Sequence, residues 1–113
     1  MLDVRIAGLA TANPPLRLSQ EESYRAYVSF LPLSDKAKSL LQRVFVDNQS
    51  IGYRHFGMDK LTDVLQDSQD ELIARYRRFS VQVAVEAANK ALNEASLTPD
   101  DIDGLVVNTC TGY

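Results

Sequence analysis

Residues 101–113 of this chain have the sequence DIDGLVVNTCTGY, and this stretch decides the fold that the sequence predicts. The apolar run Leu105–Val107 follows an acidic turn and precedes small residues with amide, hydroxyl and thiol groups. Such an order predicts a buried strand whose carboxyl end places polar side chains in a crevice. Ligands bind at the carboxyl ends of strands in open α/β sheets. We therefore expect a strand over about residues 104–110 with a ligand pocket at its end.

The composition indicates a single globular domain over residues 1–113 and excludes several functions. The 113 residues are 45% hydrophobic, which is enough for a core, and the net charge of −3 comes without a basic block for nucleic acid. Apolar runs are too short to span a membrane, and the first residues lack the layout of a signal peptide. One cysteine and one histidine cannot form an internal disulfide or a usual zinc site. We expect a cytoplasmic protein without bound metal.

The first part of the chain predicts a strand and a helical pair. Residues 3–11 are rich in apolar side chains, and the proline pair after Asn13 ends that predicted strand. Ser19 and Glu22 have the spacing of a capping box that starts a helix running to about Phe30. Ser34 begins a second helix, whose apolar stripe is Leu40, Leu41, Val44 and Phe45.

The second part predicts a loop, a long helix and a return to extended chain. Residues 47–57 carry turn formers, with a short extended piece over 53–56. A capping box over Ser68–Glu71 opens the longest helix, and an N-cap with proline over Thr98–Asp101 forms one tight turn. The helix has a broad apolar face rich in alanine, led by the stripe Leu72, Tyr76, Phe79, Val83, Ala87 and Ala91.

The order of these elements predicts an α/β fold with an incomplete sheet. Two strands, at about 3–11 and 104–110, are joined by several helices, which favours parallel pairing. Parallel sheets are covered on both faces, so two strands alone do not make a stable one. Further chain or a partner is expected to complete the sheet.

Three motifs resemble the type III polyketide synthases, the chalcone and stilbene synthase family of thiolase-fold condensing enzymes. Gly8–Pro14 is similar to the Gly-x-Ala-x-x-x-Pro opening of that family, and Arg54-His55 resembles its first extended segment. Val106–Tyr113 resembles the strand that lines the family's acyl pocket, and the Arg75–Phe79 helix supports the match. The resemblance identifies residues 1–113 as similar to the N-terminal part of a thiolase-like fold.

The resemblance implies an acyltransferase that makes polyketides by decarboxylative Claisen condensation. Acyl-CoA and malonyl-CoA are then substrates, with no permanently bound cofactor, and the partner is a second copy or the C-terminal part of the same fold. The family's catalytic cysteine, histidine and asparagine lie downstream of the motif at Val106–Tyr113. No catalytic residue is therefore assigned in this chain, which we expect to be inactive alone. The sequence does not specify the starter acyl group, the number of extensions or the mode of ring closure.

The resemblance assigns Cys110 and Thr111 to the wall of the acyl pocket. Cys110 as a nucleophile and Cys110 as a buried structural thiol are the alternatives, but a nucleophile needs a base beside it. Thr111 could instead bond the local backbone. Arg43 is the candidate for the phosphates of coenzyme A, with a solvated surface arginine as the alternative. His55 is interpreted as a hydrogen-bonded structural residue, and Arg75–Arg78 as a solvated surface.

Two other functions compete with this assignment. One is another thiolase-fold condensing enzyme, of the ketoacyl synthase or hydroxymethylglutaryl synthase type. The other is a non-catalytic dimerisation or interaction module, which the incomplete sheet would favour.

Overall fold

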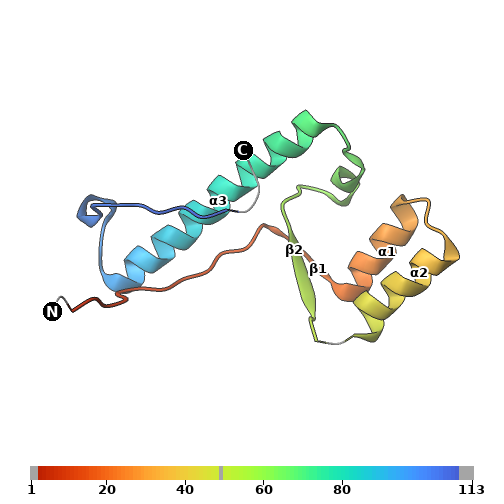
Figure 1. Cartoon of the computed structure of the whole chain (residues 1–113), viewed down its shortest axis with the longest axis horizontal. Helices are drawn as coiled ribbons and strands as arrows, with labels where there is room; N and C mark the ends of the chain where they lie inside the picture. Colours follow the sequence, from red (N-terminus) through yellow and green to blue (C-terminus); the bar gives the residue numbers. More distant parts are fainter. Residues whose placement is uncertain (1–2, 49, 110–113) are drawn as a thin grey trace.

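The computed structural model describes residues 3–48 and 50–109, which form an elongated shape with extents of 60 × 34 × 24 Å. Figure 1 shows two parts joined by a short connection. One part holds the helices α1 (Gln20–Phe30) and α2 (Asp35–Gln42) beside a small sheet. The other is the long helix α3 (Gln69–Ala95), with extended chain running along it.

The capping box predicted at the first helix is formed. The Glu22 N–H donates to Ser19 Oγ at 3.1 Å, and the Ser19 N–H donates to Glu22 Oε2 at 2.7 Å. These hydrogen bonds favour the ionised carboxylate, and the Ser19 N–H and then its hydroxyl lower the pKa of Glu22 below its ordinary value. Ser34 caps α2 through a 3.2 Å bond from the Ala37 N–H, and a π-helical turn over Arg43–Asp47 extends that helix.

The observed sheet is a two-stranded antiparallel hairpin of β1 (Leu16–Ser19) and β2 (Tyr53–Phe56), with Leu16 opposite Phe56. The prediction of parallel strands at about 3–11 and 104–110 was wrong for the residues that the structure describes, because neither range contains a strand there. The short extended piece over 53–56 is confirmed as β2. The expectation of an α/β chain with several helices and an open sheet is also confirmed.

The two predicted core strands instead lie as extended segments along α3 (Figure 1). Partial burial alternates residue by residue from Gly8 to Leu16, which is the period of a strand with one covered face. A strand also needs a neighbouring backbone to accept its hydrogen bonds, and α3 offers side chains instead. Val4 and Val106 consequently remain 89% and 93% exposed.

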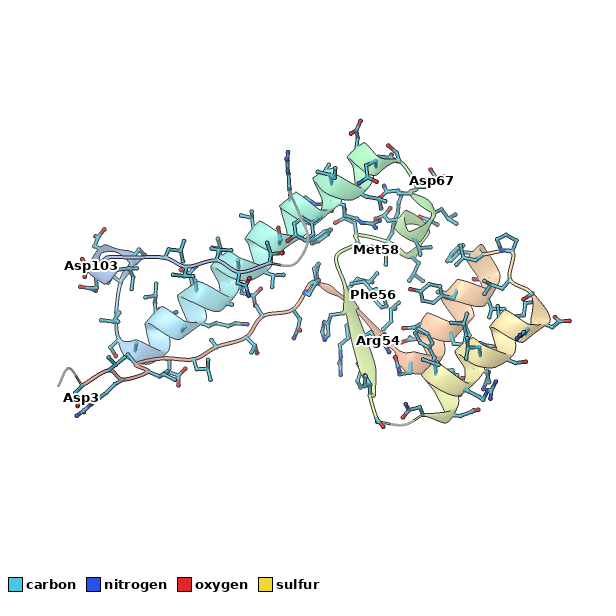
Figure 2. The ribbon with its side chains drawn as sticks, in the orientation of Figure 1. Asp3, Arg54, Phe56, Met58, Asp67 and Asp103 are labelled. Carbon is cyan, nitrogen blue, oxygen red and sulfur yellow. The ribbon has the colours of Figure 1, made fainter. Side chains whose placement is uncertain are left out.

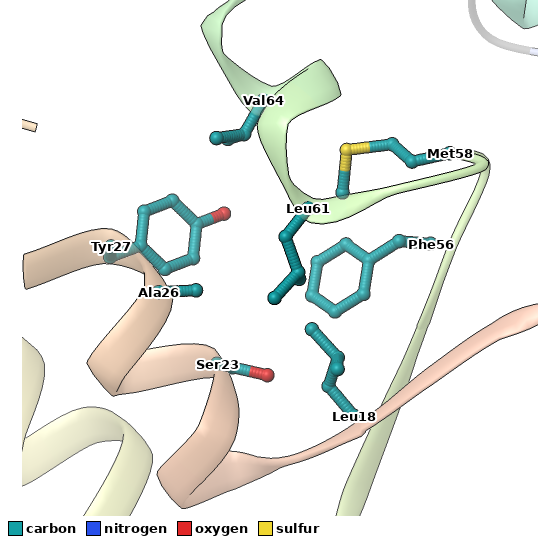
Figure 3. Close-up of a pocket in the computed structure, with 8 residues that line it drawn as sticks. All are labelled: Leu18, Ser23, Ala26, Tyr27, Phe56, Met58, Leu61 and Val64. Carbon is teal, nitrogen blue, oxygen red and sulfur yellow. The ribbon is translucent and has the colours of Figure 1, made fainter. Parts of the chain in front are cut away.

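The apolar core of the described chain is small. Met58 and Phe79 are its buried hydrophobic residues, at 8% and 5% exposure. Ser23 is 1% exposed, and its hydroxyl donates to the Ser19 carbonyl at 2.8 Å, so burying it leaves no unpaired group. Figure 3 shows the cluster around a cavity of about 20 Å³, lined by Leu18, Ser23, Ala26, Tyr27, Phe56, Met58, Leu61 and Val64.

Arginines fasten α3 to the connection that precedes it. Arg75 Nη1 donates to the Asp63 carbonyl at 2.6 Å and to Gln66 Oε1 at 3.0 Å, within the 3₁₀ turn Leu61–Leu65 and just after it. Arg78 forms a 2.5 Å ion pair with Asp59. The prediction that this arginine cluster is only solvated was therefore wrong, because these side chains reach back to the turn.

The two ends of α3 differ in how well the sequence predicted them. Ser68 is the N-cap, but its side chain makes no capping hydrogen bond, so the capping box predicted there is absent. After α3 the predicted turn is present as a 3₁₀ turn over Pro99–Asp101, and the Thr98 N–H donates to Asp101 Oδ2 at 2.8 Å. That bond and the Thr98 hydroxyl lower the pKa of Asp101.

Candidate functional site

A groove of about 580 Å³ lies between the first half of α3 and the extended segment that ends the described chain. Its walls come from separate stretches of sequence: Pro14 near the start, Gly57 after β2, one face of α3, and residues 107–109. Apolar and small side chains dominate this lining, which suits an apolar ligand. The residues are Pro14, Gly57, Leu72, Arg75, Tyr76, Phe79, Ser80, Val83, Ala84, Val107, Asn108 and Thr109.

A hydrogen bond between two hydroxyls joins the walls of the groove. Tyr76 Oη lies 2.8 Å from Thr109 Oγ1, so the aromatic side chain of α3 meets the polar end of the extended segment. Tyr76 and Phe79 are three residues apart and share one helix face. Phe79 is buried at the groove floor, where an ideal Cβ on Gly57 would lie 3.2 Å from its ring.

A histidine holds another wall of this groove in place. The Nδ1 atom of His55 lies 3.1 Å from the Pro14 carbonyl, which accepts the ring N–H. Arg54 Nε donates to Gln20 Oε1 at 2.8 Å, and its guanidinium lies 5.0 Å from the Phe45 ring centroid. The hydrogen bond of His55 is the one the sequence led us to expect, and Arg54 is hydrogen-bonded as well.

The two residues predicted to line the pocket, Cys110 and Thr111, lie outside the described residues, so their roles stay predictions. The structure places the residues just before them, Val107–Thr109, in the wall of the groove. Pro14, from the opening motif, lines the same groove. The fold thus brings together two motifs that are far apart in the sequence.

Arg43, the candidate for coenzyme A phosphates, lies elsewhere. It begins the π-helical turn after α2, is exposed, and makes no side-chain hydrogen bond or ion pair with another described residue. It does not line the groove between α3 and residues 107–109. Its role in binding coenzyme A stays a prediction from the sequence.

Tyr76 and Phe79 line the groove, but the sequence placed them only on an apolar helix face and in the Arg75–Phe79 motif, without a role in a pocket. A tyrosine on an apolar helix face carries a hydroxyl that needs a hydrogen-bond partner when the face is covered. That hydroxyl is the sequence signal that could have indicated a polar contact at Tyr76. Which partner it finds depends on the tertiary position of residues 107–109.

Within residues 3–48 and 50–109, the structure contains no cluster of three or more His, Cys, Asp or Glu side chains that could hold a metal ion. No helix over these same residues is long and apolar enough to cross a membrane.

The fold of the described chain is similar to part of a solved polyketide synthase structure. A solved structure with a similar fold is PKS-I from the brown alga Ectocarpus siliculosus, with a TM-score of 0.64 and 24% identity over 82% of this chain. The match covers 28% of PKS-I, so this chain spans less than a third of that protein's length. No protein-family model matches the chain. The structural similarity confirms the resemblance to type III polyketide synthases that the sequence motifs indicated.

Proposed function

We propose that this chain is part of an acyltransferase of the type III polyketide synthase kind. The observation that carries the proposal is the fold similarity to PKS-I, with a TM-score of 0.64 over 82% of the chain. The groove supports it, because it joins Pro14 to residues 107–109, which belong to the motifs that resemble the family. In this proposal residues 1–113 correspond to the N-terminal part of a thiolase-like domain.

The groove is the proposed wall of an acyl pocket. Its apolar lining on α3 suits a hydrocarbon chain, and Thr109 leads into Cys110 and Thr111, which would continue the wall. The substrates would be an acyl-CoA starter and malonyl-CoA. Arg43, exposed beside α2, would contact the phosphates of coenzyme A from the surface.

The proposed reaction is a decarboxylative Claisen condensation. A cysteine thiolate takes the starter acyl group from its thioester and releases coenzyme A. Malonyl-CoA then loses carbon dioxide, and the resulting enolate forms a carbon–carbon bond with the acyl carbonyl as the thiolate leaves. In the family the groups for these steps lie downstream of the last motif. His55, the single histidine, is bonded through Nδ1 to the Pro14 carbonyl, so we propose that this chain alone does not turn over.

A chimera tests the proposal directly. This chain replaces the aligned 28% of PKS-I, and carbon dioxide release from labelled malonyl-CoA is measured with an acyl-CoA starter. We expect the chimera to condense malonyl-CoA, while this chain alone and PKS-I without the replaced part do not. A folded, monodisperse chimera without activity would refute the proposed function. Turnover by the 113-residue chain alone would refute the placement of the catalytic groups elsewhere.

Arg43 has its own test in the same chimera. Arg43→Gln should raise the KM for malonyl-CoA by about two- to fivefold with kcat unchanged, the size expected for an exposed charge contact. Arg25→Gln is the matched control, because Arg25 is also an exposed helical arginine but is paired with Glu21. Equal KM values for the two variants would contradict the assignment of Arg43.

A second candidate function, an interaction module, has a specific observation in its favour. Val4, Leu105 and Val106 are 89%, 82% and 93% exposed, and such apolar side chains are usually covered by a partner. That partner would be a second copy of the chain or the remainder of a thiolase-like fold. Sedimentation of the purified chain distinguishes these outcomes: a dimer favours self-association, and a folded monomer contradicts it. A cytoplasmic location and the choice among thiolase-fold condensing reactions stay predictions from sequence.

A further inference from the structure

The described extended segments 3–11 and 103–109 do not pair through their backbones, but each accepts or donates a hydrogen bond with a side chain of α3. The Leu9 N–H donates to Glu94 Oε2 at 3.1 Å, near the end of the helix. Tyr76 Oη bonds Thr109 Oγ1 at 2.8 Å, near its start. The bond between Tyr76 and Thr109 ties the end of residues 103–109 to the first half of α3. Tyr76 therefore contributes to the position of that segment, which also lies beside apolar side chains of α3 at Leu105.

The Tyr76 side chain projects from a well-anchored part of the helix. Arg75, its neighbour, donates to the Asp63 carbonyl at 2.6 Å and so fixes this turn of α3 to the connection before it. Phe79, one turn further on, is 5% exposed. A tyrosine has two side-chain torsions, and a helix excludes one of the rotamers of the first. The phenol oxygen is thus presented to Thr109 from a rigid base.

The bonded residue lies directly before the predicted pocket residues. Thr109 precedes Cys110 in sequence, and Val107, Asn108 and Thr109 form one wall of the groove on α3. Where Thr109 sits determines where this wall stands relative to the helix. A wall held close to α3 keeps the groove narrow, and a released wall admits a longer or bulkier ligand.

We propose that Tyr76 is a positioning residue that sets the width of the acyl groove, through its hydrogen bond to Thr109, and thereby selects the length of the starter acyl chain. The inference rests on the proposed acyltransferase function for its consequence, but the restraint itself is a property of this chain. Tyr76 acts on the substrate through the wall that it holds.

The restraint is tested on the isolated chain by the labelling rate of Cys110, its single thiol, with a disulfide reagent such as DTNB. Tyr76→Phe and Thr109→Val each remove one hydroxyl and should raise the rate about fivefold, the factor that corresponds to one neutral hydrogen bond of ~1 kcal/mol. The double variant should be no faster than either single variant, because both remove the same bond. Thr109→Ser keeps the hydroxyl and should label like the unchanged chain.

Tyr24→Phe serves as the control for loss of a phenol, since the Tyr24 hydroxyl bonds no described residue. Circular dichroism checks that each variant keeps its helical content. Rates that stay within the range of the control, or that multiply in the double variant, would overturn the role of Tyr76 as a restraint.

Selectivity is tested in the PKS-I chimera with hexanoyl-CoA and dodecanoyl-CoA as starters. Tyr76→Phe should shift the ratio of their kcat/KM values toward the longer starter by about fivefold, and Thr109→Ser should leave the ratio unchanged. Equal loss of activity with both starters would indicate a purely structural tyrosine and would overturn the inference. An inactive unmodified chimera would instead refute the proposed function, while the labelling rates would still decide whether Tyr76 holds Thr109.

Discussion

Phe79 holds α3 against the connection after β2, so the substitution Phe79→Ala tests how the two parts of the molecule are joined. Its ring is 5% exposed and packs over Gly57, where a Cβ would lie 3.2 Å from three of its atoms. On the outer side, the Arg78 guanidinium lies 4.3 Å from the ring centroid. Figure 2 shows this connection between the labelled Phe56, Met58 and Asp67.

The expected loss of stability is large for a chain with so small a core. Replacing a buried phenylalanine by alanine costs about 3–5 kcal/mol, because transfer energy is lost and a cavity remains. The lost contact with Arg78 adds about 0.5–1 kcal/mol. Domains of this size have unfolding free energies of about 5–15 kcal/mol. The single substitution should therefore remove about a quarter or more of the total.

Urea unfolding followed by circular dichroism measures the effect, with Val81→Ala as the matched control. Val81 lies on the same helix but is 62% exposed, so its truncation should change stability by less than about 0.5 kcal/mol. Phe79→Leu preserves most of the volume and should cost about 1.5 kcal/mol or less, which keeps the test usable if the alanine variant does not fold. A loss for Phe79→Ala no greater than that for Val81→Ala would refute the reasoning.

Two further predictions concern the helix cap and the packing of the first extended segment. Glu22→Gln should lower stability near neutral pH and have no effect below the folded pKa of Glu22. The folded pKa is depressed below the ordinary 4.5, so the ionised cap stabilises the fold above pH 4.5, and this contribution disappears as the pH falls through the folded pKa. Unfolding midpoints of both proteins from pH 2 to 7 check this, and a difference that does not change with pH would contradict it. Gly8→Ala should cost about 1–3 kcal/mol of unfolding free energy by overpacking, because a Cβ there would overlap the Ala91 carbonyl oxygen and lie 3.3 Å from Ala95 Cβ. Gly104→Ala is the control in the same unfolding assay, because a Cβ at Gly104 would meet no atom within 4 Å. Equal losses of stability in the two variants would contradict the packing at Gly8.

The helices were predictable because their signals are local. The Ser19–Glu22 capping box, the start at Ser34 and the Thr98–Asp101 turn each depend on residues three or four positions apart. Hydrogen bonds over such spacings form wherever the chain is free to turn. The cap at Ser68 shows the limit of this argument, since it has the same spacing but makes no side-chain bond.

The candidate site was predictable in part. The motifs Gly8–Pro14 and Val106–Tyr113 indicated the family before the fold was known, and Pro14 and residues 107–109 do line one groove. Tyr76 was recognised as an apolar face position and as part of the Arg75–Phe79 motif, but not as a groove residue. Its partner, Thr109, is 33 residues away, and no local pattern links the two.

By itself, the sequence determined where the helices begin, that stretches such as 3–11 and 53–56 are extended, and which family the motifs resemble. Only the tertiary structure decided how the extended stretches pair. Residues 3–11 have strand periodicity but lie along α3, while the four-residue stretches 16–19 and 53–56 form the hairpin. Alternation of side chains is a property of one segment, whereas a ladder requires a second backbone within hydrogen-bonding distance, and that depends on where the whole chain places it.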